Sequence, residues 1–230
     1  MKRYFITGTD TDAGKTYVTR IMAKTLAEQS LRVSCLKPVA AGAVEGLDEV
    51  GKPQLHNDDA LILKNAANSQ LTYHQVNPFC FVEAIAPHIA AKINQQTITL
   101  EQIRQHIESL SLKDDICLVE GAGGFLVPLN DNESFADIPE AIGAEVILVV
   151  GMKLGCINHA LLTVQAIQAK GLTLRGWIAN QINPGMEVYQ DNLDTLTRMI
   201  DAPLIAVAEH NAESLTSSYG SGKNLSQWLL

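Results

Sequence analysis

The chain has 230 residues, of which 47% are hydrophobic and 18% charged, and its formal net charge is −8. A chain of this length and composition buries a substantial core, which excludes a disordered protein. The acidic balance argues against general binding to nucleic acids or anionic membranes, because both need a dense basic face. ATP is not excluded, because a local group of backbone amides and lysines holds phosphate even in an acidic protein.

Neither the cysteines nor the N-terminal segment indicates export. The four cysteines, Cys35, Cys80, Cys117 and Cys156, form no CxxC pair and have no zinc-site spacing with histidines, which predicts reduced thiols. The chain enters a strand at once, without an apolar segment of signal-peptide length, and no later segment has transmembrane length without charges or turn residues. We therefore expect a cytoplasmic protein with no membrane or nucleic-acid partner.

Short apolar runs alternate with helical patterns along the chain. The first strand, Tyr4–Thr7, ends in a glycine-rich turn, and the helix expected at Lys15–Gln29 has apolar residues spaced on one face. The further strands expected are Val33–Lys37, Ile116–Glu120, Val146–Val150, Leu174–Asn180 and, as the last strand, Leu204–Val207. The further helices expected are Asn158–Lys170 and one with an apolar stripe at Tyr189, Leu193, Leu196 and Ile200.

This alternation predicts one α/β domain over residues 1–230, with a central, mainly parallel β-sheet flanked by helices. Continuous Val, Ile and Leu runs indicate strands buried on both faces, and intervening helices indicate parallel strands joined by right-handed crossovers. Residues 40–57 and 65–97 are less regular and are expected to form active-site loops or an irregular lobe. The tail after Ser214 is rich in Ser and Gly and is expected to be mobile.

A glycine-rich segment, Gly8-Thr-Asp-Thr-Asp-Ala-Gly-Lys-Thr16, follows the first strand and opens the first helix. Its glycines let successive N–H groups face one anion, and the helix N-terminus adds its positive dipole end. Lys15 then reaches the β- and γ-phosphates, and the Thr16 hydroxyl holds Mg²⁺. The loop has five residues between its glycines, one more than the standard pattern. Strand, turn and helix are all in place, so we favour a phosphate-binding loop (P-loop) of the P-loop NTPase type over an ordinary strand–helix turn.

Carboxylates and a lysine stand where a P-loop needs them. The strand Ile116–Glu120 ends in a carboxylate suited to Mg²⁺, and the glycines at 121–124 allow phosphate or substrate close to the backbone. Asp58 and Asp59 precede an apolar run, so one is interpreted as a helix N-cap and the other as a second metal carboxylate. Lys37 ends the second strand, where it either points into the P-loop crevice or is a surface lysine.

Together these motifs resemble the dethiobiotin synthetase family. The matching segments are residues 8–16, Lys37-Pro-Val39, Asn57-Asp-Asp-Ala-Leu61, Pro87-His-Ile89, Val119-Glu-Gly-Ala-Gly-Gly124, Val149-Val-Gly-Met-Lys-Leu-Gly-Cys-Ile-Asn-His-Ala160 and Gly176-Trp-Ile-Ala-Asn180. Their order and spacing agree from Lys2 to about Pro203, and the lengthened P-loop is itself a feature of that family. The segment at 151–159 is highly specific to it.

The resemblance implies a ligase of biotin synthesis that uses 7,8-diaminononanoate, CO₂, ATP and Mg²⁺. One amine adds to CO₂ to give a carbamate, whose oxygen takes the γ-phosphoryl group of ATP. The second amine then closes the cyclic urea of dethiobiotin and expels phosphate. Because the carbamate and the triphosphate repel each other, cations must lie between them, and Lys15, Lys37 and Mg²⁺ are those available.

The resemblance also assigns roles to individual residues. Lys15 and Lys37 are the implied catalytic residues, and the implied metal ligands are Thr16, Asp59 and Glu120, which selects Asp59 over Asp58. The implied nucleotide contacts are Asp12, Ala13, Gly14, Lys15, Thr16, Tyr17, Asp59, Glu120, Gly121, Ala122, Gly123, Asn180, Gln181, Glu209, His210 and Asn211. The implied substrate contacts are Thr11, Lys37, Ala41, Gly155, Cys156, Ile157 and Asn158.

The family is a homodimer with substrate across the interface, so residues 155–158 would hold the substrate carboxylate from the second subunit. Free N–H groups at a helix start suit an anion, although Asn158 is also readable as a plain N-cap. Two positions depart from the family pattern. Ala41 stands where serine is usual, and Ala206-Val-Ala-Glu209 replaces Gly-Glu-Ile-Pro, which predicts a nucleotide preference looser than strict ATP.

Three other functions compete with this interpretation. A P-loop ATPase that acts as a switch or partitioning protein usually carries an extra lysine early in the loop, where this chain has Thr9 and Asp10. An amidoligase or a small-molecule kinase would use the same scaffold. A non-enzymatic paralogue has only Ala41 in its support. Lys37 together with the segment 151–159 favours the synthetase.

Overall fold

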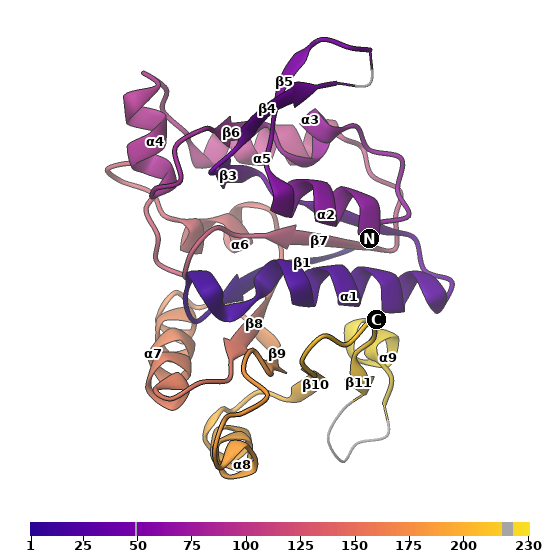
Figure 1. Cartoon of the computed structure of the whole chain (residues 1–230), viewed down its shortest axis with the longest axis vertical. Coiled ribbons are helices and arrows are strands. Elements are labelled where there is room, and N and C mark those ends of the chain that lie inside the picture. Colours follow the sequence, from indigo (N-terminus) through magenta and orange to yellow (C-terminus); the bar gives the residue numbers. More distant parts are fainter. Residues whose placement is uncertain (49, 218–222) are drawn as a thin grey trace.

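The computed structural model describes residues 1–48, 50–217 and 223–230 (Figure 1). Its elements in chain order are β1 (Lys2–Gly8), η1 (Thr11–Ala13), α1 (Lys15–Glu28), β2 (Val33–Leu36), β3 (Val39–Ala41), β4 (Val44–Leu47), β5 (Pro53–His56), α2 (Asp58–Ala66), α3 (Tyr73–Val76), β6 (Phe79–Phe81), α4 (Pro87–Ile93), α5 (Leu100–Ser109), β7 (Ile116–Glu120), η2 (Phe135–Asp137), α6 (Ile138–Ala141), β8 (Glu145–Gly151), α7 (Cys156–Ala169), β9 (Leu174–Asn180), α8 (Tyr189–Met199), β10 (Leu204–Ala208), β11 (Thr216–Ser217) and α9 (Leu225–Leu229).

The predicted central sheet is confirmed. Its strand order is β11-β10-β9-β8-β1-β7-β2, with β11 antiparallel to β10 and every other neighbouring pair parallel. Strand β1 lies between β7 and β8, in a register that pairs Ile6 with Glu120 and Gly8 with Val149. The carboxyl ends of these strands therefore meet at one edge of the sheet, where parallel α/β sheets hold their sites.

Alternating side chains of the buried strands enter cores on opposite faces of the sheet. In β1, Tyr4 and Ile6 pack with residues of α1, α2 and α9, whereas Phe5 packs with residues of α5 and α6 on the opposite face. In β8, Leu148 and Val150 pack with α7 and α8. The sheet is thus covered by helices on both faces, which is why its strands are continuous apolar runs. In the view of Figure 1, α1 crosses in front of the central strands.

The structure differs from the sequence prediction in the irregular regions and at the C-terminal end. The regions expected to be active-site loops or an irregular lobe contain two small sheets, β3 with β6 and β4 with β5. The β4–β5 hairpin projects from the body (Figure 1). The strand ending at Ala208 is not the last, because β11 follows it. The mobile tail predicted after Ser214 falls partly on residues 218–222, which lie outside the described residues. Across the described ranges, no helix is long and apolar enough to cross a bilayer.

Candidate functional site

The P-loop connects β1 to α1 through the short helix η1. Gly14, which begins α1, has φ of +81°, a left-handed conformation that strains any residue with a Cβ. A Cβ at this position would also lie 2.1 Å from Nδ2 of Asn180. That amide is buried and donates a hydrogen bond of 2.9 Å to the carbonyl of Ala13. The end of β9 therefore fixes the backbone of the loop immediately before the helix.

Lys15 is buried and turned back onto its own loop. Its Nζ donates to the carbonyl oxygens of Asp10, at 3.0 Å, and Thr11, at 3.3 Å. Burial, together with the repulsion of Lys37, lowers the pKa of Lys15 from 10.5 to about 8. A buried ammonium that is held only by carbonyl dipoles has much to gain from an anion. The position of Lys15 in the P-loop suits a phosphate ligand.

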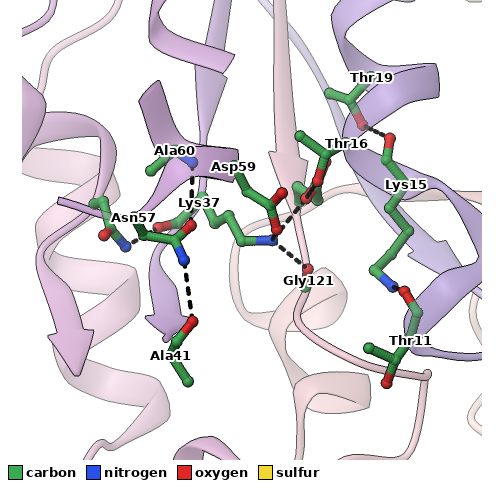
Figure 2. A network of polar contacts seen from close by, with 12 residues as sticks. Thr11, Lys15, Thr16, Thr19, Lys37, Ala41, Asn57, Asp59, Ala60 and Gly121 are labelled. Carbon is green, nitrogen blue, oxygen red and sulfur yellow. Dashed lines mark hydrogen bonds and ion pairs between the residues drawn. The ribbon is translucent and has the colours of Figure 1, made fainter. Parts of the chain in front are cut away.

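A second buried lysine, Lys37, lies at the end of β2 between two carboxylates. Its Nζ is 2.7 Å from Oε1 of Glu120 and 3.2 Å from Oδ2 of Asp59, and it donates to the Gly121 carbonyl at 3.4 Å. Thr16 donates its hydroxyl proton to the same Glu120 oxygen at 2.7 Å. Figure 2 shows the Lys37 ammonium directed at Asp59 and Gly121, on the P-loop side of α2. The alternative of a surface lysine is therefore wrong.

Charge balance at Lys37 keeps it a cation. Burial by itself would lower its pKa, but the carboxylates of Glu120 and Asp59 outweigh that effect and raise the pKa of Lys37 above its ordinary value. Glu120 is fully buried, and the Lys37 ammonium supplies a positive charge beside its carboxylate. Lys37 therefore acts as a fixed positive charge and not as a proton acceptor near neutral pH.

Asp59 is brought to the site by the N-terminus of α2. The N-cap is Asn57, whose side-chain oxygen accepts a hydrogen bond of 3.3 Å from the amide of Ala60. The expectation that Asp58 or Asp59 caps this helix is therefore wrong, because both lie within its first turn. Asn57 also donates through Nδ2 to the carbonyl of Ala41 at 3.0 Å, which joins α2 to β3. Of the two acidic residues, Asp59 lies against Lys37.

The oxygens of Thr16, Asp59 and Glu120 suit a hard divalent cation. One carboxylate oxygen of Glu120, Oε2, is buried without a hydrogen-bond partner among the described residues, which marks an unfilled acceptor. The described ranges contain no group of three or more His, Cys, Asp or Glu side chains with the arrangement of a metal site. A P-loop site does not need one, because hydroxyl, carboxylate and phosphate oxygens share the ion. The residues present therefore fit Mg²⁺ bound together with a nucleotide.

A cleft of about 810 Å³ opens at this edge of the sheet. The predicted site residues that line it are Thr11, Asp12, Gly14, Lys15, Thr16, Tyr17, Lys37, Ala41, Asp59, Ala122 and Gly123. The sequence analysis assigned no role to the residues of its apolar wall, which are Ala40, Ala84, Ile85, Ala86, Pro87 and Val127. Pro87 lay inside a matching segment, but small apolar residues carry no chemical pattern of their own.

A separate group of predicted residues lies on the other side of Tyr17, outside the lining of that cleft. The Tyr17 hydroxyl lies 2.8 Å from the carbonyl oxygens of Glu209 and of Ala212, and so ties this segment to the P-loop helix. Gln181 accepts a long hydrogen bond of 3.5 Å from the amide of His210. Asn211 is exposed, with a φ of +58°. These contacts place residues 209–212 beside α1 and Gln181 beside His210.

The predicted carboxylate-binding segment at 155–158 starts α7 and does not line the main cleft of its own chain. Gly155 is the N-cap, with φ of +92°, so the reading of Asn158 as N-cap is wrong. Leu154 before it is 98% exposed. Leu126 and Leu162 are also exposed, and both line a second, shallower cleft of about 420 Å³. Exposed leucines that line an open cleft are candidates for an interface.

Comparisons with known proteins identify the family. A family model described as an AAA domain matches residues 2–216. The ATP-dependent dethiobiotin synthetase BioD of Yersinia pestis bv. Antiqua is 42% identical over 228 residues, which cover 99% of this chain and 93% of that protein. The chain belongs to the dethiobiotin synthetase family. Two further dethiobiotin synthetases are similar over nearly their whole length. That of Pseudoalteromonas translucida is 43% identical, over 93% of this chain and 92% of that protein. BioD 1 of Escherichia coli K12 is 42% identical, over 95% of this chain and 96% of that protein.

Solved structures of other proteins have a similar fold. Chloroplast FtsY from Physcomitrella patens has a TM-score of 0.56 at 15% identity, over 99% of this chain and 65% of that one, so this chain spans less than two thirds of it. The septum site-determining protein MinD from Pyrococcus horikoshii, complexed with Mg-ADP, has a TM-score of 0.51 at 19% identity, over 90% of this chain and 80% of that one. At such identities the likeness shows the fold alone.

Proposed function

We propose that this member of the dethiobiotin synthetase family converts 7,8-diaminononanoate, CO₂ and ATP into dethiobiotin, ADP and phosphate. The observation that carries the proposal is that two buried lysines, Lys15 and Lys37, line one cleft from different elements. A P-loop alone needs only the first of them. A second buried cation in the same cleft suits a reaction in which another anion meets the γ-phosphate.

The reaction begins when one amine of the diamine adds to CO₂ and loses a proton, which leaves a carbamate. Lys37 then stabilises the carbamate oxygens, since its raised pKa keeps it charged and its Nζ lies in the cleft. Lys15 exchanges the carbonyls of Asp10 and Thr11 for phosphate oxygens of ATP. The two ammonium groups together reduce the repulsion between the carbamate and the triphosphate.

Phosphoryl transfer follows between the two anions. The carbamate oxygen bonds to the γ-phosphorus as the bond to the β–γ bridging oxygen of ATP breaks, giving a carbamic–phosphoric anhydride and ADP. Mg²⁺, held by Thr16, Asp59 and Glu120, would supply neutralising charge on the phosphates. The second amine attacks the anhydride carbon and loses a proton, the C–O bond to phosphate breaks, and the cyclic urea is complete.

The apolar wall of the cleft is suited to an alkyl chain. Ala40, Ala41 and the segment 84–87 present small side chains with no charge across from the P-loop. A nonanoate chain gains from such a wall by leaving water. Ala41 contributes its backbone carbonyl to Asn57 and has no hydroxyl to offer a substrate, so the diamine is held there by packing alone.

The nucleotide base is assigned to Gln181 and residues 209–211, next to the buried Asn180. Tyr17 supports this assignment, because it fastens that segment to the helix that begins with the P-loop. The side chain of Asn180 is already bound to Ala13, so its role is to hold the loop under the phosphates. Tyr17 and Gln181 contact this segment through its backbone, and its sequence departs from the family pattern at residues 206–209. We therefore expect a nucleotide preference looser than strict ATP.

We also propose a cytoplasmic homodimer. The exposed side chains of Leu126, Leu154 and Leu162 would be buried against the second subunit, and the amides at 155–158 would then hold the substrate carboxylate from the partner. Four free cysteines agree with a reducing compartment.

Product formation tests the function directly. Purified protein is incubated with the diamine, ¹³C-bicarbonate and Mg-ATP, and the products are analysed by mass spectrometry. The proposal predicts ¹³C-labelled dethiobiotin with one ADP per molecule. ATP hydrolysis that needs no diamine and is stimulated by a partner protein would support an ATPase switch instead, and would remove the proposal.

A further inference from the structure

The connection from β8 to α7 contacts the P-loop at several points. At Gly151 an added Cβ would lie 3.0 Å from Cα of Ala13, so the two backbones touch. The amide of Met152 donates to the carbonyl of Asn180 at 2.8 Å, and Asn180 in turn holds Ala13. Next to these contacts, Nζ of Lys153 lies 2.5 Å from Oδ2 of Asp10. The proposed function assigns no role to Lys153.

Asp10 puts a negative charge inside a loop that is built to hold an anion. Its side chain is only 27% exposed, and its second carboxylate oxygen is buried with no hydrogen-bond partner among the described residues. Its backbone carbonyl is one of the two that hold Lys15. Without a compensating cation, this carboxylate would repel the phosphates that the loop amides and Lys15 attract.

We propose that Lys153 is a positioning residue for the nucleotide site, which neutralises Asp10 and so keeps the P-loop attractive to a polyphosphate. The inference rests on the proposed function for the nucleotide itself. Lys153 acts through Asp10 and does not contact the reacting atoms. The pair also joins the loop under the phosphates to the segment that starts α7. Loss of the ion pair is therefore expected to weaken nucleotide binding more than it lowers kcat of the bound complex.

A second ion pair in the chain provides a matched control. Lys170, which ends α7, pairs with Asp137 at side-chain exposures of 37% and 28%, against 36% and 27% for Lys153 and Asp10. The two pairs share residue types and degree of burial, and differ in that only one involves the P-loop. An effect that appears at Lys153 and not at Lys170 therefore comes from the position of the pair.

The test measures Mg-ADP affinity by calorimetry in four variants: Lys153→Met, Lys153→Arg, Lys170→Met and the double variant Lys153→Met/Asp10→Asn. We expect Lys153→Met to bind roughly fivefold to tenfold more weakly, since an uncompensated charge then faces the phosphates. Lys153→Arg and Lys170→Met should bind like the wild type. The double variant should recover most of the loss, because the repelling carboxylate is gone. The KM for ATP should rise in Lys153→Met and stay near the wild-type value in Lys153→Arg and Lys170→Met, and kcat should change less than KM.

Two outcomes would overturn the inference. The first is Mg-ADP affinity in Lys153→Met equal to that of the wild type. The second is a double variant that binds as weakly as Lys153→Met, which would mean that Lys153 itself contacts the nucleotide. Thermal unfolding of each variant identifies a loss that comes from misfolding, and Lys153→Arg remains as the charge-preserving test. A wild type that binds no Mg-ADP would contradict the proposed function itself. A wild type that binds Mg-ADP, together with either result above, would contradict only the role of Lys153.

Discussion

The Lys37 ammonium lies 2.7 Å from Oε1 of Glu120, and both side chains are buried at the carboxyl ends of adjacent strands, β2 and β7. The same Glu120 oxygen accepts the hydroxyl proton of Thr16 from the P-loop. One carboxylate therefore connects the phosphate-binding loop to the second lysine. A change at any of these three residues is expected to affect both catalysis and the charge balance of the core.

We predict that Lys37→Ala abolishes turnover, with kcat lowered by at least about 100-fold, because a fixed charge that stabilises the transition state is lost. The change also leaves Glu120 buried without its cation, at a cost of about 3–5 kcal/mol in the free energy of unfolding. Steady-state kinetics and urea denaturation measure the two effects.

The double variant Lys37→Ala/Glu120→Gln separates catalysis from stability. Removing the unpaired charge should recover most of the lost stability, while turnover stays absent. Near-normal kcat in Lys37→Ala would remove the role given to this lysine.

We predict that Thr16→Val weakens Mg²⁺-dependent nucleotide binding by at least about tenfold, the scale of one lost hydrogen bond to a charged group. Valine keeps the shape of the side chain but removes the hydroxyl that contacts Glu120. Calorimetry with ADP, with and without Mg²⁺, measures the effect, and Thr16→Ser is the control that keeps the hydroxyl. An unchanged dependence on Mg²⁺ in the valine variant would contradict the metal site.

Nucleotide binding should depend on pH through Lys15. Its pKa of about 8 in the free protein must rise when phosphate binds, because the anion favours the ammonium form. Near pH 8 the complex thus holds more protons than the free protein, and Mg-ADP affinity falls as the pH rises from 7 to 9. Calorimetry in buffers of different ionisation enthalpy should show proton uptake on binding. Lys24→Met, which changes a partly exposed lysine of the same helix, is the control and should show the same uptake. Binding without proton uptake in the wild type would oppose this account of Lys15.

The same shift predicts a pH dependence of stability. The pKa of Lys15 is lower in the folded protein than its ordinary value of 10.5, so the unfolded chain binds more protons between about pH 8 and 10.5. Burial of charged Lys15 therefore destabilises the fold below pH 8, and this cost is relieved as the pH rises. Compared with Lys15→Met, the wild type should gain unfolding free energy between pH 7 and 9.5. Parallel curves for the two proteins would show that Lys15 is not perturbed.

Leu162→Asp should convert the proposed dimer into a monomer and lower activity, because a charge would enter the apolar cleft that Leu126 and Leu162 line. Sedimentation velocity gives the oligomeric state. Met199→Asp is the matched control, since Met199 is 52% exposed against 57% for Leu162 and lies on α8, outside the lining of that cleft. A wild type that sediments as a monomer while fully active would exclude the shared site.

The sequence predicted the large elements well because their signals are local. The strand Ile116–Glu120 is an unbroken apolar run that ends in a charge, and the P-loop needs its glycines in fixed places. The cap of α2 was not predictable from residue types, because Asn57, Asp58 and Asp59 all suit that position and only the backbone geometry selects Asn57.

Long-range contacts were the least predictable part of the site. Whether Lys37 faces solvent or the P-loop depends on the parallel pairing of β2 with β7, which the local pattern does not contain. The ion pair of Asp10 and Lys153 joins residues from two separate strand ends, and either alone reads as a surface charge. The apolar wall at 84–87 likewise reached the cleft only through the packing of α4 against β3 and β6.

The route of one oxygen atom tests the central claim most directly. If the carbamate oxygen takes the γ-phosphoryl group, the oxygen that joined carbon to phosphorus leaves with the phosphate. A short reaction with ¹⁸O-labelled CO₂, the diamine and Mg-ATP is therefore followed by mass spectrometry of the phosphate released. The account predicts one ¹⁸O in the phosphate for each dethiobiotin formed. Unlabelled phosphate, with label retained in the urea, would contradict it.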